Sequence, residues 1–381
     1  MSADREPSFH TILVVGVGLI GGSLAAAAKR LAPAPRILGV GRNVAGLQEA
    51  VERGIVDEFA TDQTAFDRGW FGPESPAELA VIGTPPAVTE EWIDRLASAG
   101  FPGIVTDVAS TKSGVTKAAE KHPNLRFVGG HPMAGSERSG VGAARADLFD
   151  GANYVLTPDE GTDMDAYRRL HAFVTSLGAR VVSIDADEHD RAVAAISHVP
   201  HVTAAALVSL AAQRAESGQD ALRLAAGGFK DMTRIAAGSA DLWTGICLDN
   251  AEAICTGLGE LSGLLTGFSD ALRAGQRTAV HDWLDHAVAI RQSLPAQWLP
   301  KTAALMELSV PVVDRPGMVA DVTTAVSRAG CNIEDLSIDH TSEDTAMLRL
   351  VLTDEGDIAA LLDDLGSRGY EASAQPLRGE G

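Results

Sequence analysis

The sequence is poor in cysteine and in basic residues, and both shortages exclude classes of protein. Only three of 381 residues are cysteine, an odd number without metal-type spacing, which argues against a disulfide framework. Lys and Arg number 31 against 51 Asp and Glu, and the formal net charge of −20 disfavours nucleic acid and anionic membranes as partners. The N-terminus lacks a signal-peptide pattern, and no apolar run approaches the roughly 20 residues of a membrane span. These absences predict a cytoplasmic protein.

Three kinds of sequence pattern follow one another along the chain. Apolar runs alternate with helical patterns over residues 1–184, which predicts an α/β fold, a Rossmann-like doubly wound parallel sheet. Residues 185–299 carry long apolar-periodic helices, and we expect an all-helical domain that packs against a second copy of itself in a homodimer. Residues 304–381 follow a strand, helix, strand, strand, helix, strand order, which predicts a ferredoxin-like module.

A glycine-rich turn directly follows the first apolar run. Gly16, Gly18 and Gly21 form G-x-G-x-x-G between a predicted strand and a predicted helix. In dinucleotide-binding proteins the first glycine permits the tight turn, the second admits the pyrophosphate and the third allows close helix packing. The predicted cofactor loop therefore comprises Gly16, Gly18, Leu19, Ile20 and Gly21.

Two further segments are predicted to contact the dinucleotide. At the end of the second strand, where NAD enzymes usually place an acid, the chain has Gly41 and then Arg42. A guanidinium there favours NADP over NAD, although Arg42 would fit either cofactor if it only stacks on adenine. Thr84, Pro85 and Pro86 follow another strand, where the prolines form either a wall against the nicotinamide ring or the start of a helix.

The stretch GGHPMAGSERSG, residues 129–140, places one histidine among glycines after the predicted strand RFV. We expect a loop whose backbone folds close to a ligand. In a dehydrogenase, His131 is the candidate to take a hydroxyl proton as hydride leaves, although a lone histidine is usually an ordinary polar residue. Ser110 and Thr111 follow another strand, and each hydroxyl either caps the next helix or binds substrate.

The helical region contributes histidines and cations. His198 and His201 lie three apart, but no carboxylate or cysteine stands at ligand spacing beside them, and hydride transfer to a nicotinamide needs no metal; we expect none. Lys230 and Arg234 lie four apart, so that one helix would direct both cations to the same side, toward an anion. A solvated basic face is the alternative.

These motifs together resemble the prephenate and arogenate dehydrogenases of tyrosine biosynthesis. The resemblance runs in order through GVGLIGGSLA, TDVASTKSG, GGHPMAGSERSG, DEHDRAVAAISHVPH and GGFKDMTRIAAGSADLW. It implies an enzyme, an NAD(P)-dependent dehydrogenase that oxidatively decarboxylates prephenate to 4-hydroxyphenylpyruvate. It also implies a Rossmann-like domain followed by a helical dimerisation domain.

The same resemblance assigns roles to individual residues. His131 is expected to assist deprotonation of the ring hydroxyl, with Ser110 bonded to that hydroxyl or to His131. His198 is expected at the substrate side chain, and Arg234 as a bidentate clamp on a substrate carboxylate. The remaining substrate-binding or subunit-contact candidates are Lys230, Asp231, Trp243 and Glu137.

The C-terminal module resembles an ACT domain through VPVVDRPGMVADV and AGCNIEDLSI. The residues that would border an amino-acid effector are Asp314, Pro316, Gly317 and Asn332. Feedback inhibition by tyrosine is the hypothesis that follows. The alternative is a tail that only adds dimer contacts.

Other functions remain open on the sequence alone. Arogenate differs from prephenate by an amine in place of a keto group, which the motifs do not distinguish. A homoserine-type or β-hydroxyacid dehydrogenase is a rival enzyme class, but it does not lead us to expect His131 within this stretch together with SHVPH. A non-enzymatic dinucleotide-binding sensor is the third reading, and it predicts cofactor binding without turnover.

Overall fold

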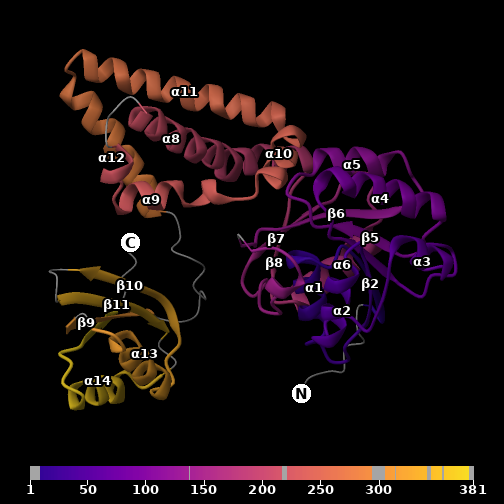
Figure 1. Cartoon of the computed structure of the whole chain (residues 1–381), viewed down its shortest axis with the longest axis horizontal. Helices are drawn as coiled ribbons and strands as arrows, with labels where there is room; N and C mark the ends of the chain where they lie inside the picture. Colours follow the sequence, from indigo (N-terminus) through magenta and orange to yellow (C-terminus); the bar gives the residue numbers. More distant parts are fainter. Residues whose placement is uncertain are drawn as a thin grey trace. The chain divides into compact units, whose positions relative to one another are not determined.

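The structure is a computed structural model that describes residues 9–136, 138–216, 221–293, 305–313, 315–340, 345–353 and 356–376. The chain forms two compact units, Met1–Leu284 and Asp285–Gly381 (Figure 1). The predicted Rossmann-like region and most of the predicted helical region therefore belong to one unit.

An eight-stranded sheet organises the first part of this unit. Its strands are β1 (Thr11–Val15), β2 (Arg36–Val40), β3 (Glu58–Ala60), β4 (Leu79–Ile82), β5 (Ile104–Asp107), β6 (Arg126–Pro132), β7 (Asn153–Thr157) and β8 (Arg180–Ser183). The order is β3-β2-β1-β4-β5-β6-β7-β8. The first six strands are parallel, as predicted, whereas β7 runs antiparallel to β6 and parallel to β8. Only the short 3-10 helix η1 (Val141–Ala143) separates β6 from β7 among the described residues, too little to form the helical crossover that a parallel pair requires.

Helices cover both faces of the sheet, as expected of a doubly wound fold. They are α1 (Leu19–Ala28), α2 (Val44–Glu52), α3 (Asp62–Asp67), α4 (Pro86–Ala99), α5 (Ser113–Glu120) and α6 (Met164–Ser176). Alternate residues of β1 belong to different cores: Ile12 and Val14 pack with α1, α2 and α6, while Leu13 and Val15 pack with α3, α4 and α5. Burial on both faces explains why TILVV is continuously apolar.

The second part of the unit is helical throughout its described residues, as predicted. It comprises α7 (Ala186–Val193), the π-helix η2 (Ala194–His198), α8 (Val199–Glu216), the 3-10 helix η3 (Ala221–Leu224), α9 (Gly227–Thr233), the 3-10 helix η4 (Arg234–Ala237), α10 (Ala240–Asp249), α11 (Ala251–Arg273) and α12 (Arg277–Ser293), of which the residues after Leu284 belong to the second unit. The run Ala186–Arg214 is the one helical stretch of the described chain that is long and apolar enough to cross a membrane. Asp190 in its first turns accepts hydrogen bonds from the backbone of α5, so this part of the run packs within the folded unit.

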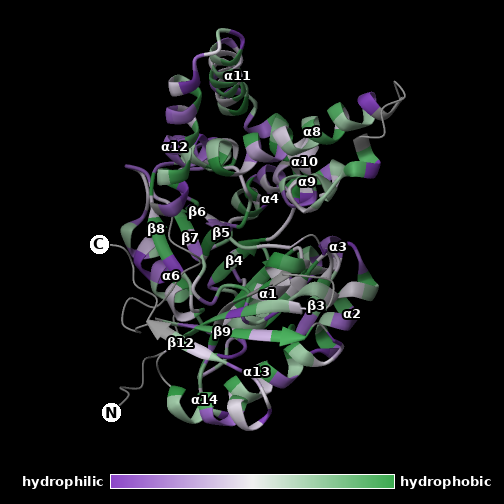
Figure 2. Ribbon diagram, turned by 90° about the vertical axis from the view of Figure 1, so that its left-hand side faces the viewer, coloured by the Kyte–Doolittle hydropathy of each residue, from purple (hydrophilic) through white to green (hydrophobic). Residues whose placement is uncertain are grey.

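The helical part leaves many large apolar side chains exposed. The most exposed on α8, α10 and α11 include Leu210, Leu248, Leu264, Leu265 and Leu272, all more than half exposed. Figure 2 shows hydrophobic residues recurring along α8 and α11. An apolar surface of this extent is typical of a protein interface.

The second compact unit holds a four-stranded antiparallel sheet. Its elements are β9 (Leu305–Val313), α13 (Met318–Arg328), β10 (Ile333–His340), β11 (Thr345–Thr353), α14 (Ile358–Ser367) and β12 (Ser373–Pro376), with the strand order β10-β11-β9-β12. This is the ferredoxin-like order that the sequence predicts. Its core joins both helices to the sheet through residues such as Val322, Leu350 and Leu361.

Candidate active site

The glycine loop after β1 has the geometry of a dinucleotide cradle. Gly16 has a positive φ of 89°, and a Cβ there would stand 2.6 Å from the carbonyl oxygen of Gly83. A Cβ on Gly21 would stand 2.3 Å from the carbonyl oxygen of Gly16, whereas a Cβ on Gly18 would meet no protein atom within 4 Å. The first and third glycines are therefore required by the fold. The open space at Gly18, at the N-terminus of α1, fits an approaching pyrophosphate.

The neighbouring strand ends complete the cofactor edge. β2 and β4 flank β1 on opposite sides, so their carboxyl ends meet at the point where the strand order reverses. Arg42, just past β2, is exposed and has no hydrogen bond to the described residues. The hydroxyl groups of Thr84 and Thr89 are hydrogen-bonded to each other at 3.1 Å. Pro86 is the first residue of α4, which confirms that this proline starts a helix. Pro85 precedes the helix and is exposed.

His131 lies in a strand, and the predicted loop begins only after it. It belongs to β6 and pairs with Val155 of β7. Gly129 and Gly130 precede it within the strand, and neither has a positive φ. Their role is steric, because a Cβ on Gly129 would stand 2.3 Å from Thr157 Oγ1 and one on Gly130 would stand 2.7 Å from the carbonyl oxygen of Asp107. The glycines thus let β6 lie close to its neighbours.

The imidazole of His131 contacts a second histidine that comes from α7. His131 Nδ1 lies 2.7 Å from His189 Nε2, and His189 Nδ1 lies 2.8 Å from Asp190 Oδ1. Burial, together with the Lys112 ammonium nearby, lowers the pKa of His131 well below its ordinary value. The ring is therefore neutral at neutral pH and able to accept a proton.

A buried ion pair fixes the backbone next to His131. Lys112 and Asp107 are fully buried, and the Lys112 ammonium bonds both the Asp107 carboxylate and the carbonyl oxygen of Gly130. Asp107 Oδ1 also accepts the Gly130 amide at 3.0 Å. Burial lowers the pKa of Lys112, and Asp107 opposes that change. The pair holds β6 at the residue that precedes the histidine.

The predicted helix cap of α5 is supplied by a different residue. Neither Ser110 nor Thr111 caps this helix; instead Asp190 accepts the backbone amides of Lys112 and Ser113, each at 2.8 Å. Thr111 is buried, with its hydroxyl 3.5 Å from Asp249 Oδ2. Ser110 is partly buried and has no hydrogen bond to the described residues, so its hydroxyl is free for a ligand at the same sheet edge as His131.

The two histidines of SHVPH both contact Trp243 but differ in their hydrogen bonds. His198 is buried and its Nδ1 lies 3.2 Å from Asn250 Nδ2, an amide nitrogen that also donates to the carbonyl oxygen of Asp190. Since an amide nitrogen only donates, the proton of neutral His198 is on Nε2. Burial lowers the pKa of His198 to about 4. His201 stacks on Trp243 with 3.5 Å between ring centroids, and its buried Nδ1 has no hydrogen bond to the described residues.

The predicted cationic face is divided between two elements. Lys230 lies in α9, whereas Arg234 is the C-cap of α9 and the first residue of η4, so the predicted single helix changes from α to 3-10 geometry at the second cation. Lys230, Asp231 and Arg234 are exposed, and none has a hydrogen bond or ion pair with the described residues. η4 contacts α8, the helix that carries His201. Glu137 lies outside the described residues.

Five polar residues of this site were not among those predicted from the sequence. They are Asp107, Lys112, His189, Asp190 and Asn250. His189 and Asp190 lie in the segment DEHD shortly before SHVPH, and Asp107 lies in TDV at the end of a predicted strand. Their positions in these motifs could therefore have marked them as site residues. Asn250, in contrast, has no local pattern that would single it out.

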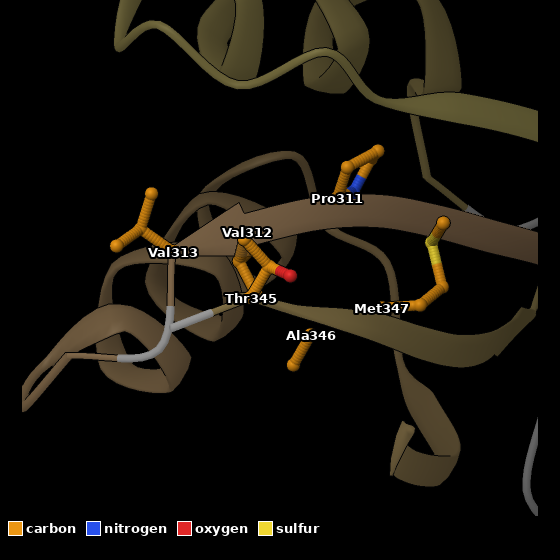
Figure 3. Close-up of a pocket in the computed structure, with 6 residues that line it drawn as sticks. All are labelled: Pro311, Val312, Val313, Thr345, Ala346 and Met347. Carbon is orange, nitrogen blue, oxygen red and sulfur yellow. The ribbon is translucent and has the colours of Figure 1, made fainter. Parts of the chain in front are cut away.

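The predicted effector residues lie at two ends of one helix. Pro316 and Gly317 precede α13, and Gly317 has a φ of 93°, while Asn332 follows α13; Asp314 lies outside the described residues. In the strand register, Ile333, next to Asn332, lies level with the start of β9. Pro316 follows the other end of β9, so the two groups of residues lie at opposite ends of the sheet. A pocket of about 260 Å³ lies beside Val313 at the Pro316 end (Figure 3). Its lining consists of Pro311, Val312, Val313, Thr345, Ala346 and Met347.

Comparison with known proteins gives consistent results over the whole chain. Residues 24–183 match the nucleotide-binding domain of prephenate dehydrogenase, residues 185–286 its dimerization domain, and residues 306–369 the ACT domain. The prephenate dehydrogenase of Bacillus subtilis (strain 168) is 33% identical over 352 residues, 91% of this chain and 93% of that protein. A cyclohexadienyl dehydrogenase of Zymomonas mobilis is 30% identical over 65% of this chain and 83% of its own length.

Solved structures give the same family. Prephenate dehydrogenase from A. aeolicus, crystallised with hydroxyphenyl propionate and NAD+, aligns with a TM-score of 0.70 at 28% identity, over 75% of this chain and 98% of that one. The arogenate dehydrogenase of Synechocystis aligns with a TM-score of 0.64 at 31% identity, over 75% of this chain and 100% of that one.

The cradle and the strand-order reversal, together with the matches to known dehydrogenases, define an NAD(P)-dependent dehydrogenase. The family models cover more than half of the chain, and the Bacillus relative is alike over nearly its full length. The chain belongs to the prephenate dehydrogenase family and carries its nucleotide-binding, dimerization and ACT domains.

Proposed function

We propose that this chain oxidatively decarboxylates prephenate to 4-hydroxyphenylpyruvate. The observation that carries the proposal is His131, a neutral imidazole at the carboxyl edge of the same sheet that holds the glycine loop. A bound dinucleotide would supply the nicotinamide carbon that accepts hydride. His131 would accept the proton of the ring hydroxyl as hydride leaves the ring carbon that carries this hydroxyl, and would return the proton to the phenol oxygen after CO2 departs.

Three side chains are proposed to orient the substrate. Arg234 offers an exposed guanidinium with no partner among the described residues, and such a fork suits a planar carboxylate. His198 carries its proton on Nε2, so it is a donor toward the substrate side chain. Ser110 would bond the ring hydroxyl. We assign Lys230, Trp243 and Glu137 to the outer part of this site.

We propose NADP as the preferred cofactor. Gly41 stands where a ribose-binding acid is usual, and the exposed Arg42 next to it suits a 2′-phosphate. The cofactor residues would be those of the glycine loop together with Arg42, Thr84 and Pro85.

We also propose a cytoplasmic homodimer that is inhibited by tyrosine. The exposed leucines of α8, α10 and α11 support the dimer, and the three free cysteines suit a reducing compartment. The ACT domain supports an amino-acid effector, with Asp314, Pro316, Gly317 and Asn332 as the proposed contacts. Because Pro316 and Asn332 lie at opposite ends of α13, one effector would contact both only between two copies of the domain.

An absorbance assay of reduced cofactor tests these proposals together. Prephenate and arogenate are each combined with NAD+ and NADP+, with and without tyrosine. We expect turnover of prephenate, faster with NADP+, and inhibition by tyrosine. Faster turnover of arogenate would transfer the assignment to that substrate, and cofactor binding without turnover of either would make the chain a sensor.

A further inference from the structure

Two buried residues of α7 form a chain of hydrogen bonds that ends on the candidate base. His189 is 1% exposed and Asp190 is 4% exposed. His189 bonds Asp190 through Nδ1 and His131 through Nε2, so it uses both ring nitrogens. His131 Nε2, in contrast, has no hydrogen bond to the described residues.

The protonation of Asp190 sets the direction of this chain. Although burial opposes ionisation, hydrogen bonds from His189, Ser113 and Lys112 lower the pKa of Asp190 to about 2. The carboxylate can only accept, so His189 Nδ1 must donate to it. In neutral His189 the other nitrogen, Nε2, then has a lone pair, and the atom 2.7 Å away, His131 Nδ1, must be the donor.

We propose that His189, oriented by Asp190, is a positioning residue that holds the His131 proton on Nδ1 and leaves Nε2 as the proton acceptor. The inference rests on the proposed role of His131 as base. Without the dyad, the ring would distribute its proton between both nitrogens, and the tautomer protonated on Nε2 could not accept a proton from the substrate hydroxyl.

The dyad also acts after the proton has moved. When Nε2 takes the hydroxyl proton, His131 becomes an imidazolium whose Nδ1–H remains bonded to His189. The charged groups that face this ring are the Lys112 ammonium, which disfavours the new charge, and the Asp190 carboxylate, which favours it; His198 is the other titratable neighbour. His189 passes the influence of the carboxylate to the ring through two hydrogen bonds.

His189 is the residue to change, because Asp190 also caps α5 and its loss would disturb the fold. His189→Leu removes the acceptor at similar volume. His189→Gln keeps an acceptor oxygen near the position of Nε2. For the leucine variant we expect kcat to fall about 10- to 100-fold, part of the effect of a general base, with KM changed less than about threefold. Glutamine should restore most of the rate.

The pH profile separates positioning from simple packing. His189 accepts the hydrogen bond from Nδ1 that stabilises the His131 imidazolium, so its loss in His189→Leu should lower the pKa of His131 and move the acidic limb of kcat/KM to lower pH, whereas His189→Gln should leave the limb close to that of the unaltered enzyme. Equal rate losses in the two variants with an unmoved limb would overturn the proposal, since a packing defect has no such signature.

The tautomer itself can be observed without any substrate. In protein labelled with 15N-histidine, the His131 signals are those lost in His131→Asn. We expect a protonated Nδ1 in the unaltered enzyme and in His189→Gln, and a larger share of protonated Nε2 in His189→Leu. A protonated Nε2 in the unaltered enzyme would overturn the proposal. Because this measurement needs no turnover, it remains valid even if prephenate is not the substrate.

Discussion

At the scale of single residues, the chemistry of His131 follows from its surroundings. Burial and the Lys112 ammonium both disfavour a positive charge on the ring. A neutral imidazole at a ligand-binding edge is suited to accept a proton and unsuited to bind a carboxylate. The anionic groups of a substrate therefore need another partner, and the exposed Arg234 is the proposed one.

Replacing His131 tests the base assignment directly. For His131→Asn we expect kcat to fall about 10²- to 10⁴-fold with little change in KM, the usual range for a group that transfers a proton. Steady-state assays with prephenate measure both constants, and thermal unfolding of the variant controls for misfolding. An unchanged kcat would remove His131 from the reaction.

The pH dependence gives a second test of the same ring. His131 acts as a base only when neutral, and its pKa is lowered from the ordinary 6.5. Activity should therefore persist as the pH falls through 6.5 and be lost only further into the acidic range. The measurement is kcat/KM against pH, which reports the free enzyme. An acidic limb at or above 6.5 would contradict a desolvated ring.

Sequence reasoning found the candidate base and the glycine loop more readily than the residues that contact the candidate base. His131 and the open Gly18 stand in motifs whose spacing is local. His189 and Asp190 reach their partners from 58 and 78 residues away, and the sequence does not show which face of α7 meets β6. The prediction of the α5 cap was wrong for the same reason. N-cap propensity favours the nearby hydroxyls of Ser110 and Thr111, whereas the carboxylate that binds the first amides of this helix comes from the distant Asp190.

At the scale of elements, most strands and helices follow from apolar patterns. TILVV and the other apolar runs predict β1, β2, β4, β5 and β6, whereas the three-residue strand β3 has no apolar run that predicts it; the ferredoxin-like module appears in the predicted order. The end of β6 could not be predicted, because Gly129 and Gly130 indicate a loop by composition. Their absent side chains serve interstrand contacts instead, which only the assembled sheet shows.

The glycine loop offers a matched pair of variants. Gly18→Ala places a methyl group in open space, so we expect unchanged thermal stability and a raised KM for the dinucleotide. Gly21→Ala forces a Cβ against the carbonyl oxygen of Gly16, so we expect a lower Tm as well. Calorimetry and cofactor titration measure the two effects. Unaltered cofactor affinity in Gly18→Ala would contradict the cradle.

At the scale of the whole molecule, the distribution of exposed apolar side chains is uneven. They are scattered over the Rossmann-like part, where Phe66 on α3 is an isolated case at 60% exposure. On α11 they recur at Leu264, Leu265 and Leu272. The apolar periodicity of these helices predicts a helical domain. It does not show whether the apolar side chains are buried within one chain or between two chains.

Charged substitutions on α11 test the proposed dimer. The double variant Leu264→Glu, Leu265→Glu should weaken self-association by at least about 100-fold in Kd, since each buried leucine contributes about 1.5–3 kcal/mol. Sedimentation over a range of concentrations measures it. Phe66→Glu is the control and should leave the dimer intact. Equal behaviour of the two variants would exclude this face of α11 from the interface.

The carboxylate of Asp190 accepts hydrogen bonds from the first backbone amides of α5, and this contact determines where a recombinant nucleotide-binding fragment should end. A recombinant nucleotide-binding fragment that stops at residue 184 omits this acid and leaves two backbone donors of α5 without their partner. A fragment that continues through Val193 keeps it, together with His189. The segment that links the two domains in sequence is thus an integral part of the first one, and protease cleavage there should loosen the catalytic edge of the sheet.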